Sequence, residues 1–373
     1  MHKNFYIALI GIGIGGIGFG LVTPVTVMLL EQNKAPAFIT GSVTMVNYLS
    51  VVLFSPIAGI LIYKFDVKKI LGLGLLIWSI GALLHVFWYI YPLLYAVKLL
   101  MGIGGTMIFV STEFIVNYYS DNINRGKNIN LYAVILSIGI ASGTILIWTI
   151  KIASWLPFLI GSIVMFIVFI FQIIMFEEIK NVHSGIDVIK MPFSKMPLLS
   201  IISAALYGFF ESSIIVVIPM FGLRNLFDVN HVSYFIASFV TGGILLLYLI
   251  GFISDKFNRH KLLLFISLLL SVFMILPSIY TNFVFLISIF FLIGGIVPAI
   301  YTVGLSYTIE KVEKKFMAQA NGYFIMMYGI GTIAGPILGA MLIDLDKKFG
   351  YWLFASIICL LFFIFFRKGR NKS

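Results

Sequence analysis

Three charged side chains, Lys98, Glu113 and Glu211, stand inside long apolar stretches of the sequence. An ionised group in the middle of a lipid-embedded helix costs about 2.5–3.5 kcal/mol on insertion scales, so such residues usually serve a function. Glu211 lies near the middle of the apolar stretch 198–221, and Tyr207, one helical turn earlier, would share its face. A carboxyl group there suits the binding and release of a proton. The alternative is a permanently protonated acid, hydrogen-bonded between helices.

Lys98 and Glu113 lie in one apolar stretch but are too far apart to pair. At ~1.5 Å of rise per residue they are roughly 22 Å apart along a helix. Lys98 would either extend to the outer membrane interface or take part in substrate recognition or proton coupling. Glu113 would join a cytoplasmic gate with Arg125 or Lys127, or contact the substrate.

Other chemistry finds no support in the sequence. Gly13, Gly15 and Gly18 form a G-x-G-x-x-G pattern, but it lies inside an apolar run without the strand that a dinucleotide site requires. Small residues at this spacing instead predict close helix packing, through the pairs Gly11/Gly15 and Gly16/Gly20. No phosphate-binding or nucleophile–base motif is present, so we expect no enzyme activity and no cofactor. The histidines show no spacing typical of metal ligands, so we expect no metal site either: His2, His85, His183, His231 and His260.

The composition predicts that lipid is the main solvent of the chain. Of 373 residues, 61% are hydrophobic and only 10% are charged, whereas soluble proteins carry about 25% charged residues. The single cysteine excludes a disulfide framework. Long apolar runs predict an all-α integral membrane protein with twelve transmembrane helices, at 5–30, 37–63, 70–88, 92–118, 128–149, 155–176, 198–221, 231–254, 262–280, 283–308, 318–343 and 350–366.

Charge placement predicts the topology. A polar linker at 177–197 divides the chain into two six-helix bundles, 1–176 and 198–373. Most of the 25 lysine and arginine residues fall in segments that share one side of the membrane, which predicts cytoplasmic termini. The net charge of +11 therefore reflects membrane orientation, and we expect no nucleic-acid partner.

The two predicted bundles show weak internal symmetry at an offset of 192 residues. Gly59-Ile-Leu-Ile-Tyr63-Lys64-Phe65 ends the second apolar run, and Gly251-Phe-Ile-Ser-Asp255-Lys256-Phe257 ends the eighth. Gly143 likewise corresponds to Gly335. A parallel repeat of six helices with a binding site near the membrane midplane is an architecture of secondary transporters.

Several motifs resemble those of the major facilitator superfamily. The segment Gly251 to Lys261 resembles the loop signature G-x-x-x-D-R-x-G-R-R, whereas Tyr63 replaces the acid in the first copy. The segment Lys98 to Gly105 resembles the helix-four motif R-x-x-Q-G-x-G-A. The segment Gly331 to Gly339 resembles the motif G-x-x-x-G-P-x-x-G. Further segments resemble the YcaD-like branch of this superfamily: Leu206 to Ser212, Pro219 to Arg224, Gly242-Gly243, Glu113, Arg125-Gly126 and Leu131-Tyr132.

This resemblance implies that the two pseudo-symmetric bundles alternate access by rocking around a central cavity. It implies a cytoplasmic gate at Gly251, Asp255, Lys256 and Arg259, and a cavity-facing Lys98. Polar and aromatic residues on the helices that would line the cavity are candidate substrate contacts, although each could be a packing residue: Asn47, Tyr48, Tyr132, Tyr207, Tyr301, Asn321, Tyr323 and Tyr328.

The function expected from the sequence is proton-coupled export of a small organic compound. The compound would be an amphipathic or zwitterionic metabolite, a metallophore-like compound or a drug, and the protein would act as a monomer in the plasma membrane. Glu211 and Lys98 would carry the coupling. The alternatives are a proton-coupled importer and a transport-inactive membrane sensor or partner-binding protein.

Overall fold

The protein is described by a computed structural model that covers residues 2–120, 125–177, 192–313 and 316–367. Every regular element in these residues is a helix, and twelve helices are long and apolar enough to cross a membrane. All twelve predicted spans are confirmed. Most ends lie within a few residues of the predicted ones, because the polar breaks that interrupt the apolar runs also end the helices.

Six long helices make up most of the N-terminal half. Their bounds are α1 Lys3–Gln32, α2 Ala37–Phe65, α3 Val67–Leu84, α4 Tyr91–Tyr118, α5 Arg125–Ile145 and α6 Leu156–Met175. Short 3-10 segments follow two of them, η1 at His85–Phe87 and η2 at Leu146–Lys151, where single α-helices had been predicted to continue.

The second six helices follow a 3-10 turn, η3, at Phe193–Lys195. Their bounds are α7 Leu198–Arg224, α8 Val229–Lys256, α9 Arg259–Ile279, α10 Phe283–Lys311, α11 Met317–Leu345 and α12 Gly350–Arg367. Their outward side chains are large and apolar, for example Phe265 and Val284, which are 60% and 68% exposed. A surface of this kind is suited to lipid.

The helices group into two compact units. The first unit contains Met1–Lys34 and Val46–Gly185, and the second contains Ala35–Met45 and Ile186–Ser373. The N-terminal third of α2 thus groups with the second unit. The division into bundles 1–176 and 198–373 stays a prediction.

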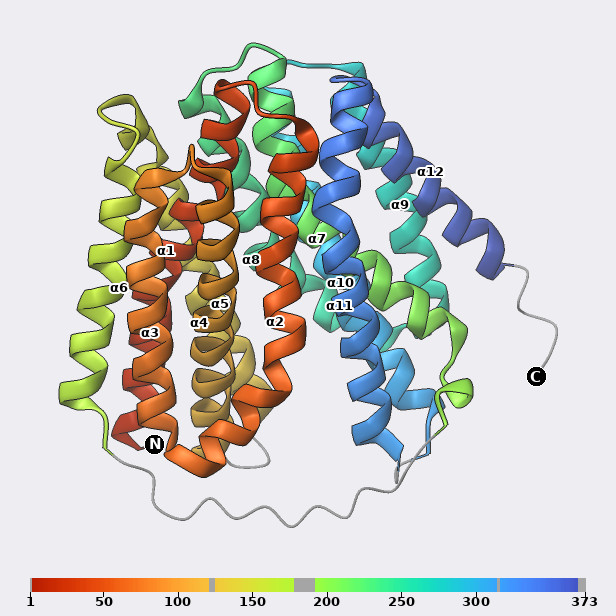
Figure 1. The fold of residues 1–373 in the computed structure, drawn as a ribbon. Coiled ribbons are helices and arrows are strands. Elements are labelled where there is room, and N and C mark those ends of the chain that lie inside the picture. Colours follow the sequence, from red (N-terminus) through yellow and green to blue (C-terminus); the bar gives the residue numbers. More distant parts are fainter. Residues whose placement is uncertain (1, 121–124, 178–191, 314–315, 368–373) are drawn as a thin grey trace. The chain divides into compact units, whose positions relative to one another are not determined.

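In the first unit, α1 packs along α5 and against α6 (Figure 1). The predicted small-residue faces of α1 are confirmed by these contacts. A Cβ atom on Gly16 would lie 2.7 Å from the Leu136 carbonyl oxygen of α5, and one on Gly15 would lie 3.4 Å from the Met165 sulfur of α6. Close backbone approach is therefore the role of the glycine-rich segment.

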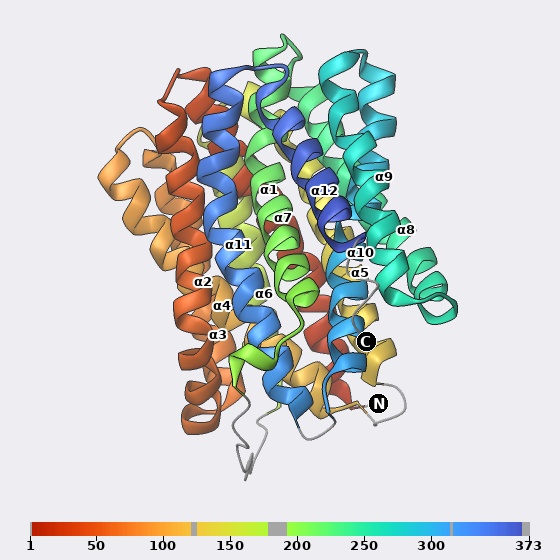
Figure 2. The same cartoon turned by 90° about the vertical axis from the view of Figure 1, so that its right-hand side faces the viewer.

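In the second unit, α7 and α11 lie side by side along their length (Figures 1 and 2). A Cβ atom on Gly208 would overlap the Tyr328 carbonyl oxygen, and one on Gly331 would overlap the Ala205 carbonyl oxygen. Gly208 and Gly331 follow Gly16 and Gly139 at the 192-residue offset. Both units therefore contain the same glycine-mediated helix pair at equivalent positions.

Candidate functional site

Glu211 occupies the midpoint of α7, equally far from Leu198 and Arg224. Its side chain is half-buried. The Tyr328 hydroxyl of α11 donates a hydrogen bond of 2.6 Å to Oε2 of Glu211. The Tyr207 side chain, one turn earlier on α7, also hydrogen-bonds to the carboxylate. Two neutral hydroxyl groups thus hold the acid in place.

Three tyrosine rings surround this acid. The rings of Tyr207 and Tyr328 are stacked, with centroids 5.5 Å apart and planes at 22°. Tyr301 of α10 lies 5.1 Å from Tyr207 and 5.7 Å from Tyr328, the latter in a T-shaped arrangement. We call these four residues, Glu211, Tyr207, Tyr301 and Tyr328, the Glu211 cluster. Every member is half-buried, so the cluster is partly accessible.

The packing of α7 on α11 places the cluster. Because Gly208 and Gly331 lack side chains, the two backbones approach closely enough for the Tyr328 hydroxyl to reach Glu211. Gly335 strengthens this contact, since a Cβ atom there would lie 2.6 Å from the Phe209 carbonyl oxygen. A larger residue at any of these positions would separate the helices and break the hydrogen bond.

No basic side chain forms an ion pair with Glu211 among the described residues. The described ion pairs of the second unit lie at helix ends instead. Arg224 pairs with Asp344 at 3.0 Å, and Arg259 pairs with Glu310 at 3.3 Å. The cluster therefore offers one carboxylate and three electron-rich rings, with hydroxyl groups as its only described donors.

The first unit has an apolar group at the positions equivalent to the Glu211 cluster. Phe19 corresponds to Glu211 and Phe109 to Tyr301 at the 192-residue offset. Phe19 and Phe109 are stacked with centroids 4.9 Å apart, and Trp78 meets Phe19 edge-on at 5.1 Å. We call these three residues the Phe19 cluster. Sequence reasoning did not single it out.

Lys98 is buried inside the first unit, with 2% of its surface exposed. The sequence left open whether Lys98 extends to the outer membrane interface, and a side chain buried in this way does not. It lies close enough to His85 for their charges to interact. His85 is also buried, and its Nδ1 pairs with the Gly81 carbonyl oxygen at 2.9 Å. The described contacts of Lys98 thus lie within the first unit.

Glu113 lies on the same helix as Lys98 but is exposed on its unit. The buried Tyr132 of α5 is close to it and forms a 3.3 Å hydrogen bond with Thr112. The side chains of Arg125 and Lys127, its expected gate partners, lie outside the described residues. The role of Glu113 stays a prediction.

The remaining candidate substrate contacts do not join the Glu211 cluster through a described contact. Asn47 is half-buried on α2, where its carbonyl oxygen faces Gly102. Asn321 is half-buried on α11, and its Oδ1 has no described hydrogen-bond partner. Tyr323 meets Phe193 edge-on at 5.2 Å. Their contribution to substrate binding stays a prediction.

The expected gate is described in part. Gly251 and the side chains of Asp255 and Lys256 lie outside the part of the chain that is described in atomic detail. Arg259 is described, and it donates a 3.1 Å hydrogen bond to the Ser306 carbonyl oxygen in addition to its ion pair with Glu310. Arg259 thus joins the start of α9 to the end of α10.

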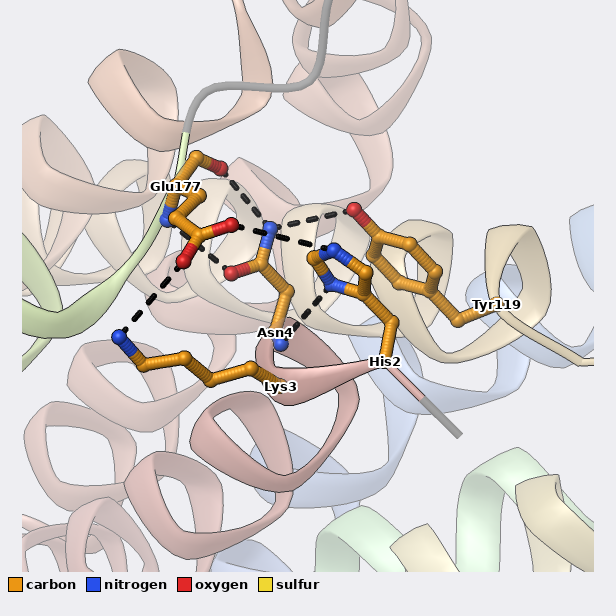
Figure 3. A network of polar contacts seen from close by, with 5 residues as sticks. All are labelled: His2, Lys3, Asn4, Tyr119 and Glu177. Carbon is orange, nitrogen blue, oxygen red and sulfur yellow. Dashed lines mark hydrogen bonds and ion pairs between the residues drawn. The ribbon is translucent and has the colours of Figure 1, made fainter.

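A second polar network ties the start of α1 to the segment after α6 (Figure 3). Asn4 is fully buried. Its side-chain amide nitrogen donates hydrogen bonds to the Tyr119 hydroxyl at 3.1 Å and to the Glu177 carbonyl oxygen at 2.8 Å. Its Oδ1 accepts a hydrogen bond of 3.0 Å from the backbone N–H of Glu177. His2 stacks on Tyr119 with centroids 4.4 Å apart, and Lys3 lies 3.7 Å from the Glu177 carboxylate. Partial burial raises the pKa of Tyr119, although the Asn4 hydrogen bond opposes this. The network therefore joins the start of α1 to the end of α4 and to the segment after α6.

Among the described residues, no group of three or more histidine, cysteine or acidic side chains is arranged to hold a metal ion. Tyr328, like Tyr301, is a member of the Glu211 cluster that sequence reasoning placed only among general candidate substrate contacts. It lies 117 residues from Glu211. The glycines Gly208 and Gly331, related to Gly16 and Gly139 by the repeat, are the signal that could have placed it beside α7.

Twelve membrane helices, two units with equivalent helix pairs, and an acid at the midpoint of a helix define a multi-pass membrane protein of the secondary-transporter type. The family model of the Major Facilitator Superfamily matches residues 8–202 and 200–373. The chain belongs to this superfamily. It is therefore a transporter rather than an enzyme.

Two curated relatives are named as uncharacterized transporters of this type. YfkF of Bacillus subtilis is 23% identical over 99% of this chain and 96% of its own length. YcaD of Escherichia coli is 23% identical over 66% of this chain and 64% of its own length. The resemblance to the YcaD-like branch is thereby confirmed.

Solved structures show the same fold. A point mutant of the nucleoside transporter NupG superimposes with a TM-score of 0.81 and 14% identity over 99% of this chain and 100% of that chain. A bacterial homologue of the human lysosomal transporter Spinster gives a TM-score of 0.78 at 14% identity over 97% of this chain and 94% of that chain. At this identity the likeness establishes the fold alone.

Proposed function

We propose that the protein is a proton-coupled exporter of a small organic compound, with Glu211 as the group that exchanges the proton. The observation that carries this proposal is the position of Glu211. It is a half-buried carboxylate at the midpoint of α7, held by Tyr207 and Tyr328 and without a described basic partner. An acid so placed is costly to keep without a use.

Alternating occupancy of Glu211 would produce exchange. If the proton and the substrate compete for the carboxylate, each transport cycle must load one and release the other. In this proposal the termini are cytoplasmic, the protein acts as a monomer in the plasma membrane, and Arg259 with Asp255 belongs to the cytoplasmic gate. Lys98 and Glu113, which belong to the first unit, would assist the coupling or the gating.

The proposal is tested in proteoliposomes that enclose a pH-sensitive dye. A panel of organic compounds is added under an imposed pH gradient, and compound-dependent proton flux is recorded for the wild type, Glu211→Gln and the control Glu31→Gln. We expect flux in the wild type and the control, and none in Glu211→Gln. Right-side-out and inverted vesicles, compared with the same compound, distinguish export from import.

One outcome would contradict the role of Glu211. If Glu211→Gln is well folded, as judged by gel filtration and thermal melting, and still transports with wild-type rate and pH dependence, then Glu211 is a packing residue. The coupling would then have to be sought at Lys98 or Glu113.

A further inference from the structure

We infer that the Glu211 cluster selects organic cations, so that the exchange would be one proton against one monovalent cation. This inference rests on the proposed function, because it assigns a substrate class to the same site. Three features of the cluster support it: its charge, its rings and the absence of a described basic partner.

The charge of the cluster favours a cation. Glu211 contributes a carboxylate that receives hydrogen bonds from the hydroxyl groups of Tyr207 and Tyr328. Among the described residues, no lysine, arginine or histidine pairs with it. A ligand ammonium group would supply the missing positive charge, whereas a ligand carboxylate would be repelled.

The rings of the cluster strengthen this preference. Tyr207, Tyr301 and Tyr328 lie within 5.7 Å of one another, and each presents an electron-rich ring. A cation over the face of a tyrosine ring is attracted by the electron-rich ring, and the attraction is stronger where water is excluded. Because the rings contact one another, the cation would sit against the half-exposed side of the cluster, beside the carboxylate, rather than between the rings.

The positions of the first unit that are equivalent to the Glu211 cluster do not offer this combination. The Phe19 cluster has aromatic rings at equivalent positions but no carboxylate. It could contact the apolar part of a ligand, but it would not select its charge. Charge selection is therefore assigned to the second unit.

A single carboxylate also fixes the electrical balance of the exchange. It holds either one proton or one monovalent cation, so a complete cycle moves one positive charge in each direction and no net charge. A zwitterionic or neutral substrate exchanged for one proton would instead move one net charge. The membrane potential would then drive the cycle.

The first test uses three aromatic probes of similar size: benzyltrimethylammonium, benzyl alcohol and benzoate. Binding to the full-length protein in an uncharged detergent is measured by calorimetry at several pH values. We expect the cation to bind at least about tenfold more tightly than the other two, a difference of ~1.4 kcal/mol. Its binding should weaken as the pH falls, because protons compete for the carboxylate.

Matched variants assign the effect to the cluster. Glu211→Gln should weaken cation binding at least about tenfold and remove its pH dependence, and Tyr301→Leu should weaken it through loss of one ring. Glu31→Gln and Tyr280→Leu, the same changes outside the cluster, should leave it unchanged. Equal binding of the three probes, or undiminished cation binding in a well-folded Glu211→Gln protein, would overturn the inference.

A second measurement separates this inference from the proposed function. Transport of benzyltrimethylammonium is followed in proteoliposomes driven either by a pH gradient or by a potassium diffusion potential alone. Transport driven by the pH gradient and not by the membrane potential supports both the proposed proton coupling and the inferred substrate class. Cation-selective, Glu211-dependent binding without proton-driven transport would retain the substrate class and refute the coupling. Proton-driven transport confined to benzyl alcohol or benzoate would do the reverse.

Discussion

The two units share a framework but differ in what that framework presents at equivalent positions. Gly16 with Gly139 in the first unit and Gly208 with Gly331 in the second allow the same close contact between two helices. Beside that contact, the first unit places Phe19 and the second places Glu211. The repeat has thus preserved backbone packing, which depends on the absence of side chains, while the neighbouring side chain was free to change.

The chemical difference extends to the partners of these two residues. Phe19 packs against the rings of Phe109 and Trp78, neither of which carries a hydroxyl group. Glu211 faces tyrosines, whose hydroxyl groups satisfy a carboxylate. A polar group in one repeat is therefore accompanied by donors that the other repeat does not need.

The most severe test of this comparison is to place the acid in the wrong unit. Phe19→Glu should lower the free energy of unfolding by roughly 3–5 kcal/mol, as expected for loss of a packed aromatic ring, because the new carboxylate would stand between aromatic rings without the tyrosine hydroxyl groups that surround Glu211. Phe19→Leu is the control and should cost less. Thermal melting in detergent measures both. If the two variants melt together, the first unit accommodates an acid and the comparison fails.

The shared framework is tested by adding a methyl group to it. Gly208→Ala should destabilise the protein by about 1–3 kcal/mol, because the Cβ atom would overlap the Tyr328 backbone. Gly16→Ala should have an effect of the same sign in the first unit. Gly322→Ala and Gly59→Ala are controls, since a Cβ atom at either position meets nothing within 4 Å. Loss of stability in only one unit would show that the helix pairs are not equivalent.

A smaller effect is expected from removing one donor of the Glu211 cluster. Tyr328→Phe deletes the 2.6 Å hydrogen bond but keeps the ring. The net contribution of a hydrogen bond is about 0.5–1.5 kcal/mol, so proton-driven transport should fall by up to about tenfold. Tyr280→Phe, which changes an exposed tyrosine of the same unit, should transport normally. Wild-type transport by Tyr328→Phe would show that the contact is dispensable.

The smallest expected effect concerns the last helix of each unit. Asp346 accepts hydrogen bonds from the backbone of Lys348 and Phe349 before α12, at 2.8 and 2.7 Å, whereas α6 has no side-chain cap. These bonds hold the pKa of Asp346 below its ordinary value of 3.8. A lowered pKa contributes stability that is present above pH 3.8 and lost as the pH falls through the folded-state pKa.

Asp346→Asn should therefore lower the melting temperature slightly at neutral pH. The difference from the wild type should shrink as the pH is reduced below the ordinary aspartate range. Melting curves of the wild type and the variant across pH measure this. A difference that stays constant at all pH values would show that the cap does not depend on charge.

The fold was predictable because the twelve apolar runs and the polar breaks between them are the dominant pattern of the sequence. Part of the candidate site was also predictable. Tyr207 shares a helix face with Glu211, and a spacing of four residues brings such side chains together in any helix. The pairing with Tyr328 was not predictable in this way, because it depends on how α7 packs on α11.

The unpredicted features all depend on contacts between distant segments. The burial of Lys98 beside His85 follows from packing in the first unit, and helix spacing alone left two positions open for it. The Phe19 cluster was hidden because aromatic residues are too common in this chain to stand out. Only the repeat, once its glycine contacts are seen, shows that Phe19 and Glu211 are equivalent.

The hydrogen bonds between Asn4 and Glu177 have a consequence for biosynthesis. The two residues are separated by 173 positions, so these hydrogen bonds cannot form until Glu177, which follows α6, has left the ribosome. At about 5–20 residues per second, this delay is roughly 9–35 s. These hydrogen bonds can form at that moment, before Glu211, which lies 34 residues further along the chain, has left the ribosome. The start of α1 can therefore take up its final contacts only after the sixth helix has been made.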